Sequence, residues 1–204
     1  MPVLTIFAGV NGAGKSTLHN YLDQQHYPQF GVRICPDEIL CEQGGDWANK
    51  ADQMRSGKVA LERIKECLEK RKSFNWETTI LTNFNIEYIK KAKELGYHIR
   101  LNFIGVGDVN LSLQRIENRV QNGGHGIDEK IVRYRYNHQF DHLSEVLPYL
   151  DHAIFFNNEN DIEIVGTYFD KTLTFFNIDN SWARQLKENL ELKLDDPLKT
   201  QYIK

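Results

Sequence analysis

Residues 9–16 read Gly-Val-Asn-Gly-Ala-Gly-Lys-Ser, which matches the complete pattern G-x-x-x-x-G-K-[ST]. An apolar run, Val3–Ala8, precedes this stretch, and a helical pattern over Thr17–Gln25 follows it. A strand, a glycine-rich turn and the first turn of a helix place successive backbone N–H groups around a phosphate group. The sequence therefore predicts a phosphate-binding loop between the first strand and the first helix of an α/β fold.

Within this loop, two side chains have specific expected roles. Lys15 is expected to reach the β- and γ-phosphates of a nucleotide, and the Ser16 hydroxyl is expected to ligate Mg²⁺. We expect the nucleotide to be ATP rather than GTP. The residues expected to bind it are Gly9, Asn11, Gly12, Ala13, Gly14, Lys15, Ser16 and Thr17.

Composition limits the class of protein. The 204 residues suit one domain with a small appendage, and a hydrophobic content of 41% is enough for a core. A net charge of −3 argues against a general nucleic-acid binder. The three cysteines form neither a zinc pattern nor a disulfide framework. With no apolar run long enough for a membrane span and no signal peptide, we expect a cytoplasmic protein without membrane contact.

Apolar runs alternate with helical patterns along the chain, which predicts β-α-β units and a parallel sheet with helices on both faces. The expected strands are Leu4–Ala8, Val32–Cys35, Phe74–Glu77, Ile99–Val106 and Ala153–Phe156. The expected helices are Thr17–Gln25, Trp47–Lys72, Ile86–Leu95, Val109–Asn122 and Asp128–Leu150, the last with a break. The predicted architecture is that of a P-loop kinase with a five-stranded parallel sheet.

The pattern changes after residue 157. Ile162–Tyr168 and Lys171–Asn177 predict a short hairpin, and a charged helix is expected over Trp182–Leu194. We therefore expect residues 1–160 to form the kinase-like core and residues 161–204 to form an extension packed on the same domain.

Two carboxylates follow predicted strands. Asp37 comes just after the second strand, and Glu77 ends the third, with Thr78 beside it. In open parallel sheets the ligand crevice lies outside the carboxyl ends of the strands, so both are expected to face an acceptor. Asp37 would act as the base for an acceptor hydroxyl, and Glu77 and Thr78 would hold the acceptor. The alternatives are that Asp37 caps the next helix and that Thr78 or Thr79 starts one.

A basic segment forms the third part of the expected site. Residues 115–135 hold five Lys or Arg against three Asp or Glu, in an otherwise acidic chain. Arg119, Arg133 and Arg135 are expected to form a catalytic lid, at about residues 119–135, that neutralises a transferring phosphoryl group and excludes water. Because Arg133 and Arg135 diverge by roughly 200° on a helix, only one of them is expected to enter the site. The alternative is a solvated, salt-bridged helix pair.

With these motifs in view, the chain resembles the zeta-toxin-like family of P-loop kinases. The resemblance covers about residues 1–160 and rests on the order of Ala8–Thr17, Pro36–Ile39, Glu77–Thr79, Arg119–His125, Ile131–Tyr136 and Asn157-Asn158. It implies ATP- and Mg²⁺-dependent phosphorylation of a hydroxyl substrate, which is UDP-N-acetylglucosamine in the toxins. It also implies that Asp37 is the general base, that the arginines clamp the γ-phosphate, and that Asn157 or Asn158 lies near the adenine.

The resemblance leaves the biological role open. A small-molecule kinase is the leading hypothesis. A nucleotide-dependent switch with little transfer is one alternative, and the toxin of a toxin–antitoxin pair, with an antitoxin protein as partner, is another. A pure switch has no need of both Asp37 and Glu77, so the two carboxylates favour a kinase.

Overall fold

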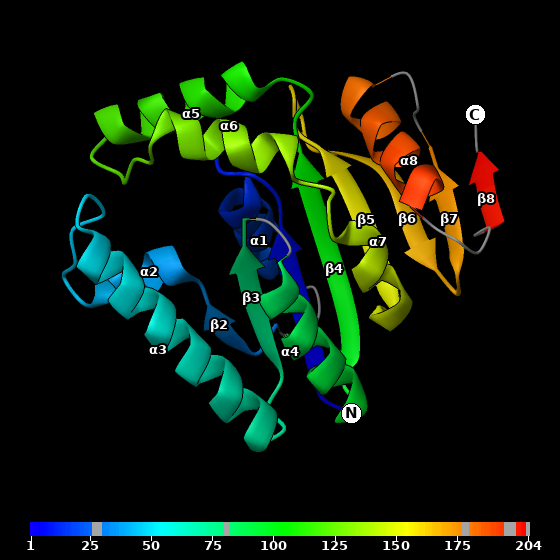
Figure 1. The fold of residues 1–204 in the computed structure, drawn as a ribbon, viewed down its shortest axis with the longest axis horizontal. Helices are drawn as coiled ribbons and strands as arrows, with labels where there is room; N and C mark the ends of the chain where they lie inside the picture. Colours follow the sequence, from blue (N-terminus) through cyan, green and yellow to red (C-terminus); the bar gives the residue numbers. More distant parts are fainter. Residues whose placement is uncertain (26–29, 80–81, 177–179, 194–198, 203–204) are drawn as a thin grey trace.

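The structure is a computed structural model that describes residues 1–25, 30–79, 82–176, 180–193 and 199–202. In this part of the chain, eight strands form one sheet in the order β2-β3-β1-β4-β5-β6-β7-β8 (Figure 1). The strands are β1 (Val3–Ala8), β2 (Val32–Ile34), β3 (Phe74–Thr78), β4 (His98–Gly105), β5 (His152–Asn157), β6 (Glu163–Phe169), β7 (Thr172–Phe175) and β8 (Lys199–Tyr202).

The five strands from β2 to β5 in this order are all parallel, which confirms the predicted core. β6 then pairs with β5 in the antiparallel sense, β7 is antiparallel to β6, and β8 is parallel to β7. The predicted hairpin therefore extends the same sheet, and β8 is a strand that the sequence pattern did not indicate. Because β1 lies between β3 and β4, the carboxyl ends of these strands meet at one edge, where Ala8 is in register with Thr78 and Phe103.

The helices cover both faces of the sheet. They are α1 (Lys15–Gln24), α2 (Pro36–Glu42), α3 (Lys50–Glu69), α4 (Asn83–Glu94), α5 (Val109–Gln121), α6 (Glu129–Asn137), α7 (Leu143–Val146), the 3-10 turn η1 (Leu147–Tyr149) and α8 (Ser181–Lys193). Figure 1 shows α5 and α6 crossing above the end of β4, and α4, α7 and α8 on the near face of the sheet.

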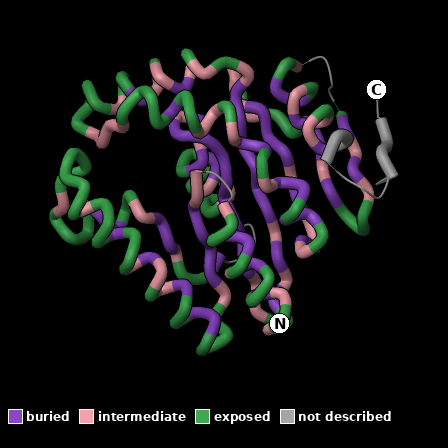
Figure 2. The backbone as a smooth tube through the Cα atoms, viewed as in Figure 1, coloured by how far each residue is buried: buried purple, intermediate pink, exposed green. Residues whose placement is uncertain are grey.

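Two apolar clusters flank the sheet, and the central strands are buried along most of their length (Figure 2). The larger cluster joins α3, α4, α7 and α8 to one face, and the smaller one seats α1 on the other through Leu18 and Phe7. Burial on both faces explains why these strands read as continuous apolar runs. None of the described helices combines the length and the apolar character that crossing a membrane requires.

One predicted helix was wrong in its boundaries, and one helix was not predicted. The predicted helix Trp47–Lys72 begins only at Lys50, because the Asn49 side chain accepts a hydrogen bond from the Ala51 amide and caps it. Separate from it, α2 follows β2 directly, and the sequence pattern did not predict it because seven residues are too few for a clear period. Of the C-terminal predictions, Asn177 and Leu194 lie outside the described residues.

Candidate functional site: the phosphate loop and the pocket beside it

The loop of residues 9–16 has the backbone geometry that close contact with phosphate requires. Gly12 and Gly14 have φ of 78° and 102°, which favour glycine, and Gly14 is the N-cap of α1. A Cβ atom on Gly14 would lie 2.4 Å from the Asn158 side chain, so the loop leaves no room for another residue there. The helix thus begins at Lys15, two residues before the predicted start at Thr17.

Lys15 is a buried cation in this loop. Only 6% of the residue is exposed, and its Nζ donates a hydrogen bond to the Val10 carbonyl over 3.1 Å. Burial lowers the pKa of the ammonium group, while the nearby carboxylates of Glu77 and Asp37 act in the opposite direction. A bound phosphate would supply further negative charge and favour the protonated form.

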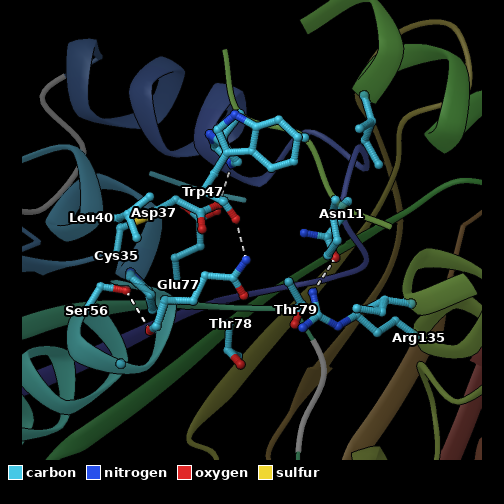
Figure 3. A pocket seen from close by; sticks show the side chains of 18 of the residues that line it. Asn11, Cys35, Asp37, Leu40, Trp47, Ser56, Glu77, Thr78, Thr79 and Arg135 are labelled. Carbon is cyan, nitrogen blue, oxygen red and sulfur yellow. Dashed lines mark hydrogen bonds and ion pairs between the residues drawn. The ribbon is translucent and has the colours of Figure 1, made fainter. Parts of the chain in front are cut away.

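A pocket of about 1190 Å³ opens beside the loop at the carboxyl edge of the sheet. The loop, α2, α3, the end of β3, α5 and α6 contribute its walls. Figure 3 shows Asp37 and Glu77 on one side of this pocket and Asn11 and Arg135 on the other. The structure therefore brings some of the predicted residues into one cavity, namely Asn11, Lys15, Asp37, Glu77, Thr78 and Arg135, whereas Ser16, Arg119, Arg133, Asn157 and Asn158 do not line it.

Asp37 lies in the first turn of α2 and faces the loop between α5 and α6, which belongs to the segment expected to form a lid. Its Oδ2 accepts a hydrogen bond from Nε2 of His125, in the α5–α6 loop, over 2.7 Å. The side chain is still 52% exposed, so its desolvation is partial. Desolvation raises the pKa of Asp37, but the hydrogen bond and charge of His125, with Lys15 and Arg119, lower it by more. The alternative that Asp37 caps α2 is wrong, because the N-cap is Cys35.

Glu77 is buried at the end of β3 and lies against the phosphate loop. Its two carboxylate oxygens accept hydrogen bonds from the Ser16 hydroxyl over 3.2 and 3.1 Å. Arg33 of β2 donates to Glu77 and, over 3.0 Å, to Asn75. Thr78 lines the pocket from the same strand, and α4 is capped by Thr82, so neither Thr78 nor Thr79 starts a helix. Glu77 therefore lines the pocket and also contacts Ser16, the expected Mg²⁺ ligand.

The three lid arginines have different environments. Arg135 donates a hydrogen bond to Asn11 of the loop over 2.7 Å. Arg119 has two buried nitrogens, Nε and Nη2, with no hydrogen-bond partner among the described residues. Desolvation lowers the pKa of Arg119, although Asp37 and Glu77 partly offset this. Arg133 is exposed and pairs with Glu129 over 2.8 Å. Of the two arginines on α6, Arg135 lines the pocket and Arg133 does not.

The far side of the loop is supported by the end of β5. The Asn158 amide donates to the Ala13 carbonyl over 2.8 Å, whereas Asn157 is buried with its Oδ1 unpartnered in the described structure. Arg115 donates to the Gly12 carbonyl over 3.5 Å and to the Glu159 carbonyl over 3.1 Å. Arg115 therefore braces the loop from behind rather than facing the pocket.

One tetrapeptide, Asn49-Lys50-Ala51-Asp52, matches the Asn-Lys-x-Asp sequence that reads the base in GTPases. The structure gives these residues other functions. Asn49 caps α3, and Asp52 accepts a hydrogen bond from the Asp46 amide and pairs with Arg55. Asn49 and Asp52 are thus engaged within their own segment, so the match does not identify a guanine site.

The comparisons agree with this geometry. A family model described as "Zeta toxin" matches residues 1–167. The chain belongs to the zeta toxin family. An uncharacterized protein of Haemophilus influenzae is 35% identical over 130 residues, which are 64% of this chain and 89% of that protein. Members of the zeta toxin family are phosphotransferases with a P-loop kinase fold.

Solved structures show the same fold at low sequence identity. One chain of the AvrRxo1-ORF1:-ORF2 complex with ATP has a TM-score of 0.69 and 16% identity, and the match covers 97% of this chain. This chain spans only 66% of that protein's length. A chain of the PezAT toxin–antitoxin system of Streptococcus pneumoniae has a TM-score of 0.59 and 18% identity, and covers 80% of this chain and 70% of that one.

Arg33 contacts a predicted site residue of this zeta toxin family member, Glu77, and the sequence did not predict that contact. Arg33 comes two residues before Cys35, on a short edge strand, and no motif contains it. Its partners Asn75 and Glu77 alternate along β3 and so share one side of that strand. One signal could have predicted this contact. It is an arginine just before the end of one strand, together with a glutamate at the end of the neighbouring strand.

His125→Ala is expected to raise the pKa of the Asp37 carboxyl, because the His125 contact is the largest influence that lowers it. A lowered folded-state pKa stabilises the protein above the unfolded-state value, and this contribution is lost as the pH falls through the folded-state value. The acid unfolding midpoint of His125→Ala should therefore lie at higher pH than that of the wild type. Carboxyl-carbon NMR titration of Asp37 measures the shift directly.

His142→Ala is the matched control, because His142 also contacts a carboxylate, Glu145, but on the surface away from the pocket. That variant should leave the Asp37 titration unchanged. An Asp37 titration that is the same in His125→Ala and the wild type would contradict the assigned contact.

Proposed function

We propose that this chain is an ATP-dependent kinase that transfers the γ-phosphoryl group to a hydroxyl of an acceptor bound in the pocket. The observation that carries the proposal is that two guanidinium nitrogens of Arg119, Nε and Nη2, are buried without a hydrogen-bond partner among the described residues, while the charges of Asp37 and Glu77 act on this arginine. Buried donors without hydrogen bonds are costly, and a phosphoryl group at this place would satisfy them.

On the donor side, Lys15 and Arg135 complete the cationic environment. Lys15 would bind the β- and γ-phosphates, and Arg135, now held by Asn11, would join Arg119 on the oxygens of the transferring group. The Ser16 hydroxyl and the Glu77 carboxylate offer the oxygen ligands that Mg²⁺ prefers, directly or through water. When bound there, Mg²⁺ would neutralise charge on the phosphates.

On the acceptor side, Asp37 would orient the hydroxyl and take its proton. The acceptor oxygen forms a bond to the γ-phosphorus as the bond from that phosphorus to the β–γ bridging oxygen breaks, and ADP leaves. The hydroxyl proton passes to the Asp37 carboxylate, whose lowered pKa keeps it ionised at neutral pH. Glu77 and Thr78 would hold other polar groups of the acceptor, and closure of the lid over the pocket would exclude water.

The acceptor that we propose is a sugar nucleotide, with UDP-N-acetylglucosamine as the first candidate. A pocket of about 1190 Å³ exceeds the range of roughly 300–1,000 Å³ typical of small-ligand sites, and it therefore has room for a large acceptor. Its outer wall includes Trp47 and Phe84, whose rings are partly exposed and available to a planar group.

The test is an initial-rate assay with ATP, Mg²⁺ and a panel of sugar nucleotides, free sugars and nucleosides. We expect phosphorylated product from at least one sugar nucleotide, and a faster rate of ATP consumption when that acceptor is added. Tight ATP binding with no acceptor-stimulated turnover across the panel would favour the nucleotide-dependent switch instead.

A toxin role is a second candidate, favoured by the likeness to a chain of the PezAT toxin–antitoxin system. An antitoxin protein would then be the partner. Induced expression of the chain in a bacterial host should arrest growth, and Lys15→Ala should abolish the arrest. Normal growth on induction of soluble, active wild-type protein would contradict this role.

A further inference from the structure

The C-terminal helix α8 lies beyond residue 167, where the match to the zeta toxin family ends. Its Trp182 is fully buried and stacks on Phe103 of β4 at 5.9 Å between ring centroids. A Cβ on Gly105 would lie 1.9 Å from the indole Nε1, so the ring sits directly on the backbone of β4. Helix α8 therefore packs near the carboxyl end of β4. This strand lies next to β1, the strand that leads into the phosphate loop.

From this position, α8 holds the C-terminal end of the lid helix α6. The Trp182 Nε1 donates a hydrogen bond to Oε1 of Gln139, two residues after α6 ends, over 3.2 Å. Gln185, one turn further along α8, lies beside Tyr136, the last but one residue of α6: burial raises the pKa of the Tyr136 hydroxyl, and the Gln185 side chain acts in the opposite direction. The Tyr136 hydroxyl also donates to the Gly107 carbonyl over 2.6 Å. Two hydrogen bonds, with the Gln185 side chain beside them, thus hold the point at which α6 meets the sheet.

The residue next to Tyr136 is Arg135, which reaches Asn11 of the phosphate loop. Arg135 lies inside the pocket while Tyr136 packs against the apolar cluster beneath α1. Any rotation of α6 about its axis moves both side chains together, because they are adjacent on one helix. The position of the Arg135 guanidinium therefore depends on the contacts that hold Tyr136.

The N-terminal end of α8 also reaches the other lid helix. Asn180 and Ser181 contact the carboxylate of Glu159 over 3.3 and 3.5 Å. The backbone carbonyl of Glu159 accepts a hydrogen bond from Arg115 of α5. Residues at the start of α8 thus contact α5 indirectly, through Glu159, and contact the end of α6 through Trp182.

We propose that α8 is a positioning element of the catalytic site, in which Trp182 and Gln185 fix the base of α6 and thereby place the Arg135 guanidinium for phosphoryl transfer. This inference rests on the proposed kinase function. It assigns a role to the C-terminal extension, which would otherwise be a cover for the apolar face of β4 and β5. Trp182 and Gln185 act through Arg135 and touch no substrate.

The test is a double-mutant cycle between Gln185→Leu and Arg135→Ala, repeated with Trp182→Phe in place of Gln185→Leu. Trp182→Phe keeps an aromatic ring and removes the hydrogen bond to Gln139, and Gln185→Leu keeps a side chain of similar size and removes the amide beside Tyr136. In the wild-type background we expect kcat to fall by about 10- to 100-fold, with the KM for the acceptor unchanged, since a misplacement of about 1 Å has this effect. In the Arg135→Ala background the same substitutions should change kcat by less than about 2-fold.

Glu188→Gln is the control, because Glu188 is an exposed residue of the same helix, and it should change neither kcat nor the coupling. Losses of kcat that multiply in the double variants would overturn the proposal, since they would show that α8 acts independently of Arg135. Unchanged kcat in both α8 variants would overturn it equally.

Amide hydrogen exchange separates this inference from the proposed function. Protection of the α6 amides, residues 129–137, should fall in Gln185→Leu and stay at the wild-type level in Glu188→Gln, with or without transfer activity. If the wild type transfers no phosphate, the kinase proposal fails and this exchange measurement still decides whether α8 fixes α6. Equal α6 protection in Gln185→Leu and the wild type would refute the inference by itself.

Discussion

Arg119→Ala is expected to lower kcat for phosphoryl transfer by about 10³- to 10⁵-fold, the range found when a charge-stabilising arginine is removed from such sites. Two nitrogens of the Arg119 guanidinium are buried without a partner among the described residues, the charges of Asp37 and Glu77 act on it, and we expect it to bind the oxygens of the transferring group. The substitution should not lower the melting temperature through lost hydrogen bonds, because Nε and Nη2 have no partner among the described residues to lose. Steady-state kinetics and thermal unfolding of the same preparations measure both effects.

Arg133→Ala is the matched control for this prediction. Arg133 lies on the neighbouring helix α6, where it is exposed and pairs with Glu129, whereas Arg119 has two buried nitrogens without a partner among the described residues. Removal of the Arg133 side chain should change kcat by less than about 2-fold, since exposed ion pairs contribute little. If Arg119→Ala and Arg133→Ala lost activity to the same small degree, the electrostatic role assigned to Arg119 would be wrong.

Asp37→Asn is expected to lower kcat by about 10²- to 10⁴-fold, which is the usual contribution of a general base. Asparagine keeps the shape of the side chain and can still hydrogen-bond to His125, but it cannot accept the proton of the acceptor hydroxyl. The dissociation constant of ATP should change little, because Lys15 and the backbone of the loop, rather than Asp37, are expected to bind the phosphates. Transfer rates with saturating acceptor and a separate ATP-binding titration distinguish the two effects.

Glu42→Gln, on the same helix, tests whether any loss of charge on α2 has this effect. Glu42 is exposed and pairs with Arg63. That variant should keep near wild-type turnover. Equal transfer by Asp37→Asn and the wild type to every acceptor would remove Asp37 from the mechanism and leave the base unidentified.

Much of the fold could be predicted because its signals are local. The phosphate loop is a contiguous motif, and the central strands are apolar runs because both faces of the sheet are covered. The placement of Asp37 and Glu77 followed from one rule, that parallel strands end at the same edge of the sheet. The rule needs only the strand assignments, which the sequence supplied to within two residues.

What could not be predicted depends on contacts between distant segments. His125 and Asp37 are 88 residues apart, and no local pattern indicates their hydrogen bond. Arg33 belongs to a three-residue strand, which is too short to show a period. The choice between Arg133 and Arg135 required the rotation of α6 about its axis, which no local pattern indicates; the Tyr136 hydroxyl of α6 is held by the carbonyl of Gly107, 29 residues away.

In the mechanism that we propose, one pocket holds ATP and the acceptor together, so that phosphate passes to a hydroxyl of the acceptor rather than to water. The most direct measurement is a single-turnover, chemically quenched reaction of the protein with γ-labelled ATP, Mg²⁺ and the acceptor. We expect the label to appear on the acceptor, with little free phosphate, and we expect Asp37→Asn to slow this transfer. Label found only as inorganic phosphate, at a rate that is the same with and without acceptor, would contradict this mechanism.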